Sequence, residues 1–178
     1  NGPRPGRSAG VRRICSALTL PGRALLSHIP RAVTELHDLS ADILPSAREI
    51  SAAVWNSLVP STAGRPDNPF LDHAFFLALE ESGSATRRTG WQPQHILLKS
   101  GDRPVGLMPA YLKSHSQGEY VFDHGWADAF ARAGGEYYPK LQSAVPFTPV
   151  AAPKLLVAND DPALKRALLA TAETLAAR

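Results

Sequence analysis

The sequence predicts an α/β or α+β domain in which helices pack against an antiparallel or mixed β-sheet. Helical patterns lie at both ends of residues 45–178 and surround short apolar runs that have the length of strands. The pair Gly101-Asp102 separates two of these runs and is typical of a hairpin turn. The 178 residues are 44% hydrophobic and 20% charged, near the globular average, so the composition argues against wholesale disorder.

Two helices are expected before the first strand. Ser46 and Glu49 have the spacing of a capping box, which places the start of the first helix there. The second helix is expected to begin at Asn68-Pro69, because asparagine is a good N-cap and proline is favoured in the first turn. Residues 70–79 are apolar on nearly all sides, which predicts a heavily buried helix that ends near Gly83.

Three strands are expected in the middle of the chain. Residues 95–99 form a short apolar run, and residues 103–113 form a longer one after the turn. Two prolines in the longer run cannot donate to a β-ladder, so this strand is expected at a sheet edge or beside a bulge. Residues 119–123 are expected to form the third strand.

The last third of the chain is expected to alternate between helices and extended segments. The sequence predicts a short helix over 125–133, an extended proline-rich segment over 137–153, a strand within 154–158 and a final helix that Asp161-Pro162 caps. The tryptophans that are expected to anchor the core are Trp55, Trp91 and Trp126.

Residues 1–44 are expected to be a basic tail outside the folded domain, which spans 45–178. The first 34 residues hold six arginines and no acidic residue, whereas the remainder holds 13 basic and 16 acidic residues, a net charge of −3. This uneven charge does not indicate DNA binding by the domain. The tail is interpreted as disordered or as a non-native leader, with a twin-arginine signal or a transit peptide as alternatives. No apolar run is long enough for a membrane span.

Four longer stretches resemble a bacterial protein family. They are residues 68–75, 111–116, 118–127 and 137–149. These stretches resemble segments of the FemAB-like family of peptidoglycan biosynthesis and recognition, and they occur in the same order as in that family. Its members are predicted N-acyltransferases. The resemblance implies a GNAT-like fold, a three-layer α/β/α domain with a mixed, largely antiparallel central sheet. Family members look like two tandem GNAT-like halves, so the chain is interpreted as a truncated N-terminal half whose missing partner is the C-terminal half.

The resemblance implies a cytoplasmic enzyme that moves an acyl or aminoacyl group onto an amine, expected to belong to a peptidoglycan precursor. Acyl-coenzyme A and aminoacyl-tRNA are both open as donors. The nearest match to a GNAT phosphate loop, residues 132–137, follows a helix instead of opening one, so this half alone is expected to lack a coenzyme A site and to be inactive. The alternatives are a non-catalytic domain that recognises a peptidoglycan-like ligand or a partner, and a purely structural fragment.

Asp123 and His124 are the candidate catalytic residues. An amine must lose a proton before acylation, and histidine has a suitable pKa for accepting it. Asp123 is a candidate for orienting His124, with helix capping as the alternative. No metal site is expected, because Cys15 is the single cysteine and His115 and His124 are not spaced as a helical pair of metal ligands.

The candidate substrate-binding residues come from the proline-rich segment. Aromatic rings on a segment held rigid by prolines are typical of a pocket wall, and a lysine there can meet a carboxylate or phosphate. These residues are Tyr137, Tyr138, Lys140 and Phe147.

Overall fold

The computed structural model describes residues 12–14, 38–62 and 65–177, and the predictions for the rest of the tail lie outside these residues. The α-helices are α1 (Ala52–Leu58), α2 (His73–Glu81), α3 (His124–Arg132) and α4 (Pro162–Ala176). The strands are β1 (Arg12–Ile14), β2 (Leu39–Leu44), β3 (Ser61–Thr62), β4 (Arg65–Pro66), β5 (Trp91–Pro93), β6 (His95–Ser100), β7 (Arg103–Met108), β8 (Tyr111–Lys113), β9 (Lys140–Gln142) and β10 (Leu156–Val157).

The main sheet has five strands in the order β1-β2-β6-β7-β10, and a second sheet has the order β5-β8-β9. Strands β6 and β7 form the expected hairpin around Gly101-Asp102. Every pairing among the described strands is antiparallel, so the sheet is not mixed. The antiparallel alternative of the sequence prediction is therefore the one that the described strands adopt.

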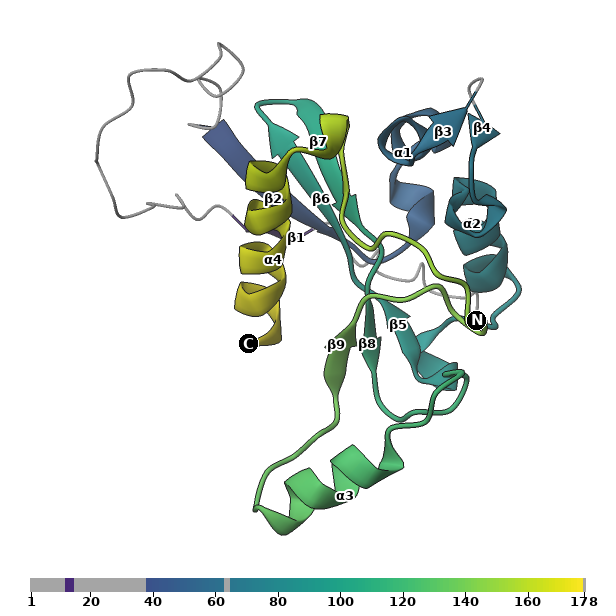
Figure 1. Cartoon of the computed structure of the whole chain (residues 1–178), viewed down its shortest axis with the longest axis vertical. Coiled ribbons are helices and arrows are strands. Elements are labelled where there is room, and N and C mark those ends of the chain that lie inside the picture. The colour runs from purple at the N-terminus through teal and green to yellow at the C-terminus, as the bar shows by residue number, and fades with distance from the viewer. Residues whose placement is uncertain (1–11, 15–37, 63–64, 178) are drawn as a thin grey trace, which may run out of the picture.

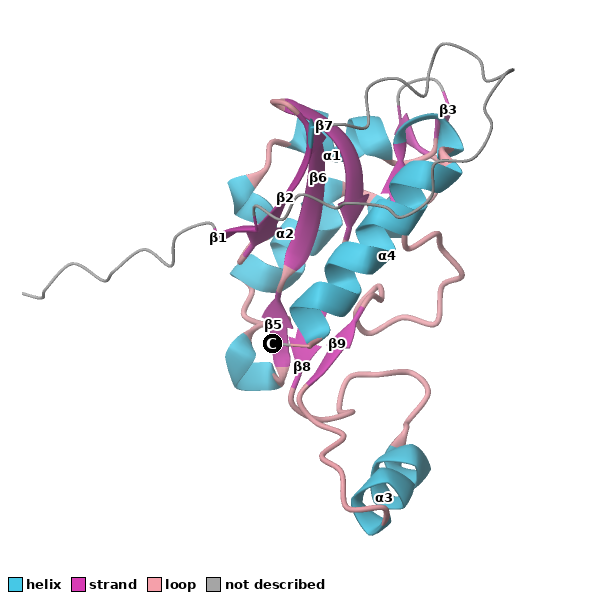
Figure 2. Ribbon diagram, turned by 90° about the vertical axis from the view of Figure 1, so that its left-hand side faces the viewer, coloured by secondary structure: helices cyan, strands magenta, loops and turns pink. Residues whose placement is uncertain are grey.

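Helices cover both faces of the main sheet (Figures 1 and 2). Alternate residues of β6 point to opposite faces, as strand geometry requires. Ile96 and Leu98 belong to the apolar cluster that contains Leu168 of α4, whereas Leu97 belongs to the cluster that contains Trp55 of α1. The expected three-layer α/β/α architecture is thus confirmed, with one core on each face of the sheet.

The predicted strand 103–113 divides into two strands at Pro109, and each part joins a different sheet. β7 lies between β6 and β10, so the prediction of an edge position is wrong for this part. The alternative prediction of a bulge is confirmed, because the register with β6 shifts between Leu98 and Lys99, opposite Pro104. β8 then pairs with β5 and β9 in the second sheet.

The prediction of a third strand over residues 119–123 is wrong. This segment belongs to the loop between β8 and α3, and β8 is paired on both edges, with β5 and with β9. The loop leads into α3, which projects from the body of the molecule (Figure 1). Trp126 on α3 is 75% exposed, so it is not a core residue, whereas Trp55 and Trp91 are buried as predicted.

Two predicted helices are each split by extended residues, the first at Ile50 and Ser51 and the second at Asp72. Ser46 caps a short 3-10 helix, Ala47–Glu49, and Ser51 then caps α1. Asn68 likewise caps a 3-10 helix, after which Asp72 caps α2. In α2, His73 and Phe76 are buried while Ala74 and Ala78 are exposed, so the prediction of burial on nearly all sides is wrong.

Three strands, β1, β2 and β9, lie in segments that the sequence predicts to be irregular. β2 forms six residues of the expected tail and pairs along its whole length with β6, so the folded domain includes residues before 45. β9 lies inside the expected proline-rich loop, and β10 agrees with the strand predicted within 154–158. The predicted helices at 125–133 and after Asp161 are confirmed as α3 and α4.

A buried polar network joins α2 to the main sheet. The Glu80 carboxylate accepts hydrogen bonds from Ser46 Oγ at 2.7 Å and from the Ala47 amide at 2.9 Å. His95 Nδ1 accepts from the Ala110 amide, so Nε2 carries the proton and donates to Glu80 Oε1 at 2.8 Å. Because these partners come from distant parts of the chain, the network fixes α2 against β6.

Candidate functional site

A row of three cross-strand neighbours marks one face of the second sheet. Trp91 of β5 lies opposite Lys113 of β8, and Lys113 lies opposite Lys140 of β9. Directly opposite residues in adjacent strands share a face, so two cations stand next to each other beside an indole ring. Such a pair of like charges requires compensation from elsewhere in the chain.

Lys113 is the more buried of the two lysines. Its side chain is fully buried, and Nζ lies 3.6 Å from the centre of the Trp91 ring. Nζ also donates to the Gln117 carbonyl at 2.9 Å. Burial lowers the pKa of Lys113 to about 8, and the charge of Lys140 acts in the same direction, while Glu119 partly offsets both.

The loop that follows β8 supplies the compensating carboxylates, Glu119 and Asp123. Glu119 Oε2 accepts a hydrogen bond from Lys140 Nζ at 3.1 Å, and Oε1 lies 3.9 Å from Lys113 Nζ. Lys140 also forms an ion pair with Asp123. The four side chains therefore alternate in sign, and we call Lys113, Glu119, Lys140 and Asp123 the charge cluster.

Asp123 is held in its ionised form. Burial alone would raise its pKa, but the hydrogen bonds from Lys140 and Tyr138 outweigh that effect and lower it to about 2. The bond from Tyr138 Oη to Oδ1 is 2.6 Å long. Both carboxylate oxygens are thus bonded to residues other than His124, and Asp123 makes no side-chain hydrogen bond as the N-cap of α3.

His124 lies at the exposed beginning of α3. Its Nδ1 is 3.3 Å from Ser116 Oγ, and its ring stacks on Phe122 with the ring centres 5.6 Å apart. Ser116 itself is buried. The imidazole is therefore oriented by Ser116 and Phe122 and remains open to solvent on its other side.

Three of the four candidate binding residues surround Asp123. Lys140 Nζ lies 5.4 Å from the ring centre of Tyr137 and 5.6 Å from that of Tyr138. Burial, together with hydrogen bonding to Asp123, raises the pKa of both tyrosines, and the same carboxylate raises the pKa of Lys140 against the effect of burial. Phe147 stands apart from this group and packs on Trp91, with the ring centres 5.4 Å apart.

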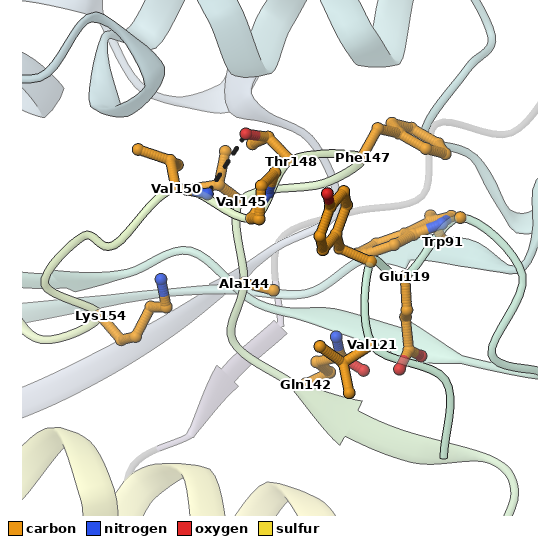
Figure 3. A pocket seen from close by; sticks show the side chains of 13 residues that line it. Trp91, Glu119, Val121, Gln142, Ala144, Val145, Phe147, Thr148, Val150 and Lys154 are labelled. Carbon is orange, nitrogen blue, oxygen red and sulfur yellow. Dashed lines mark hydrogen bonds between the residues drawn. The ribbon is translucent and has the colours of Figure 1, made fainter. Parts of the chain in front are cut away.

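A pocket of about 260 Å³ opens beside the charge cluster (Figure 3). Trp91 and Phe147 line it together with valine side chains, and Glu119, Gln142 and Lys154 are polar groups in its wall. Glu119 Oε1 and Gln142 Oε1 are both buried without a hydrogen-bond partner. Buried acceptors are normally satisfied, so this pair marks the pocket as a place where a donor is missing.

The backbone around the pocket is specialised for close packing. Gly118 has a φ of +79°, and a Cβ atom there would lie 2.5 Å from the Phe147 ring and 2.7 Å from Trp91 Nε1. Phe147 itself has a φ of +60°, which is rare for a bulky residue. Strained residues of this kind persist where the surroundings hold them in place, and they concentrate at functional sites.

Comparison with protein families matches residues 46–178 to the FemAB-like family, described as peptidoglycan biosynthesis/recognition. The chain belongs to the FemAB-like family. This membership covers the main sheet from β6 onward, the charge cluster and the pocket, and it relates the chain to peptidoglycan biosynthesis. Comparison with curated proteins and with solved structures gave no match.

Sequence reasoning missed Lys113, Glu119 and Lys154 in this FemAB-like chain. No sequence signal separated Lys113 from Lys99, which also follows an apolar run, because a lysine at the end of a strand is ordinarily exposed. No signal was present for Glu119, since its partners lie on β8 and β9 and only the fold brings them together.

The part of the chain that the structure describes holds no cluster of three or more side chains able to ligate a metal ion. Within the same residues, no helix combines the length and apolarity that crossing a bilayer requires.

Proposed function

We propose that this FemAB-like chain takes part in the transfer of an acyl or aminoacyl group onto an amine of a peptidoglycan precursor. The observation that carries this proposal is Glu119 Oε1, a buried carboxylate oxygen with no hydrogen-bond partner in the wall of the pocket. An ammonium group offers three hydrogen-bond donors, and a donor is what Glu119 Oε1 lacks, because Lys113 Nζ at 3.9 Å is too far away to form a hydrogen bond. The amine of the acceptor is therefore assigned to the pocket beside Glu119.

The residues near the charge cluster divide into two proposed roles. His124 is the proposed base, because its imidazole is exposed and oriented by Ser116, and acylation requires the ammonium to lose a proton. Asp123 is proposed to act as a positioning residue, since with a pKa of about 2 it holds no proton to exchange near neutral pH. Its bonds to Lys140 and Tyr138 fix the loop from which α3 and His124 begin.

The proposed donor is acyl-coenzyme A or aminoacyl-tRNA, bound by a second GNAT-like domain in the cytoplasm. Residues 132–137, the nearest match to a phosphate loop, lie at the C-terminal end of α3. The helix dipole is negative at that end, so this stretch does not favour a phosphate group. The proposal therefore assigns acceptor binding to the described domain and the donor to a separate partner domain.

The test measures acceptor binding and transfer separately. Calorimetric titration of the chain with a peptidoglycan stem peptide that bears a free side-chain amine should give saturable binding, and N-acetylation of that amine should weaken binding about tenfold or more. Glu119→Gln should have a similar effect, whereas the exposed Glu136→Gln serves as the matched control. Equal binding of the amine and its N-acetyl form would contradict the proposal.

A second candidate function, recognition without catalysis, is favoured by the pairing of Asp123. Its carboxylate is bonded to Lys140 and Tyr138 rather than to His124, so no aspartate–histidine pair is formed between these two residues. Mass spectrometry of the stem peptide after incubation with each donor distinguishes the two functions. Binding without a mass increase, in the presence of the partner domain, would identify the chain as a recognition module.

A further inference from the structure

The pocket beside the charge cluster carries a second charged group, Lys154, which the proposed function does not use. Lys154 lines the pocket and is half-buried, just before β10. Burial is the single cause that lowers its pKa, and no carboxylate among the described residues pairs with it. A half-buried ammonium without a counter-ion is a ready partner for an anion.

The ammonium of Lys154 and the buried acceptor oxygens of Glu119 and Gln142 lie at different sides of the pocket. In Figure 3 the Lys154 side chain stands at one side, whereas the Glu119 carboxylate and the Gln142 amide lie toward the other. The acceptor side offers two buried oxygens without donors, and the Glu119 side chain is only 7% exposed. The pocket thus presents acceptors at one end and a cation at the other.

The walls between these ends are mostly apolar. Trp91 and Phe147 form one part of the lining, and Val121, Val145 and Val150 contribute aliphatic surface. The volume of about 260 Å³ lies below the roughly 300–1,000 Å³ of pockets for drug-sized ligands. A ligand that fills it is therefore small and carries an apolar portion between its charged ends.

We propose that this pocket binds a small zwitterion, an amino acid or dipeptide with an apolar side chain, with its ammonium at Glu119 and Gln142 and its carboxylate at Lys154. This inference rests on the proposed function for the ammonium end and adds the carboxylate end. The positive φ of Phe147 and the glycine at position 118 bring the two aromatic rings close to the ligand space. The two lysines and two carboxylates of the charge cluster have a net charge of zero. Because a zwitterion is itself neutral, it can pair with Glu119 and Lys154 without changing that balance.

The experiment is an NMR titration of the chain with alanyl-phenylalanine, in the L,L and D,D forms, followed through the indole resonance of Trp91. The C-terminal amide of each dipeptide removes the carboxylate, and the N-acetyl form removes the ammonium. We expect the dipeptide of one handedness to bind and both derivatives to bind about tenfold or more weakly, because each loses one charged hydrogen-bonded contact. The comparison is made on the unaltered chain, so it does not depend on whether a variant folds.

Two variants assign the ends of the ligand. Lys154→Met should bind the dipeptide and its amide equally, while it should still discriminate against the N-acetyl form. Glu119→Gln should show the reverse pattern. Lys165→Met is the matched control, since Lys165 pairs with Asp160 and does not line the pocket.

The outcomes separate the two proposals. If the amide binds as well as the free dipeptide while the N-acetyl form does not, the zwitterion proposal is overturned and the amine site at Glu119 stands. If the N-acetyl form binds as well as the free dipeptide, both proposals are overturned. If neither handedness binds but the stem peptide does so through its amine, the pocket does not take a small zwitterion and the proposed function survives.

Discussion

Lys113 and Lys140 stand directly opposite each other on β8 and β9, so that two ammonium groups share one face of a three-stranded sheet. Glu119 lies between them and contacts Lys140 Nζ at 3.1 Å and Lys113 Nζ at 3.9 Å. The loop after β8 therefore has an electrostatic reason for folding back over the sheet.

Removing one lysine should change the titration of the other. The pKa of Lys113 is lowered to about 8, chiefly by burial, and the positive charge of Lys140 contributes to this lowering. Lys140→Met should therefore move the Lys113 midpoint upward, which NMR titration of the lysine side chains measures directly. The control is Lys165→Met, on α4, which should leave the Lys113 midpoint unchanged; an unshifted midpoint in Lys140→Met would contradict the assigned coupling.

The lowered pKa of Lys113 also determines the direction in which its contribution to stability changes with pH. Between about 8 and the ordinary value of 10.5, the unfolded chain binds more protons at this position than the folded chain does. The contribution of Lys113 to the free energy of unfolding should therefore increase as the pH rises through this window. Urea denaturation at several pH values, compared with Lys113→Met, isolates the contribution, and a decrease attributable to Lys113 would show that its pKa is not lowered.

Asp123 should stabilise the fold at neutral pH and lose this effect in acid. The pKa of Asp123 is lowered from 3.8 to about 2 in the folded chain. Its contribution to the free energy of unfolding is therefore complete above pH 3.8 and is lost as the pH falls through about 2. Asp123→Asn should reduce the free energy of unfolding at pH 7 by about 1.5–3 kcal/mol, the range for charged hydrogen bonds. The difference from the unaltered chain should shrink toward pH 2.

Asp128→Asn is the matched control for Asp123, because it lies exposed on the same helix, α3. It should change stability by less than about 0.5 kcal/mol. Equal effects of the two substitutions would mean that the bonds of Asp123 to Lys140 and Tyr138 do not stabilise the fold.

Gly118→Ala should cost more than a positive φ alone explains. A Cβ atom at Gly118 would overlap the Phe147 ring and Trp91 Nε1, whereas a Cβ at Gly101, which also has a positive φ, would meet nothing within 4 Å. Thermal or urea unfolding should show Gly118→Ala to be less stable than Gly101→Ala by about 1–3 kcal/mol, the usual cost of overpacking. Similar losses in both variants would indicate that the pocket wall is not tightly packed.

Glu80→Ala should destabilise the domain without acting through the pocket. It removes the acceptor of Ser46, Ala47 and His95, and buried donors without partners cost about 1–3 kcal/mol each. The adjacent Glu81→Ala, whose side chain is exposed and pairs with Arg48, should cost less than about 1 kcal/mol. Under conditions where both variants are folded, their affinity for the stem peptide should be unchanged. This result would distinguish the structural role of the Glu80 carboxylate from the proposed binding role of Glu119.

Elements with a complete local signal were predictable from the sequence. The Asp161-Pro162 cap and the leucine pattern behind it predict α4, and the turn Gly101-Asp102 predicts the β6–β7 hairpin. The stretch 119–123 also has a strand pattern, yet it is a loop in which Glu119 and Asp123 pair with Lys140 of β9. Propensity describes what a segment can form, while tertiary contacts decide what it does form.

The sequence by itself determined the layered α/β architecture, the family and the proline-rich segment that carries Tyr137, Tyr138 and Lys140, because these rest on local patterns along the chain. Only the tertiary structure decided that Asp123 is bonded to Lys140 and Tyr138, that Glu119 lies between two lysines, and that Lys154 faces the same pocket. The physical reason is that charges and buried acceptors act through space. Their partners are set by the register of β5, β8 and β9, which no spacing along the sequence encodes.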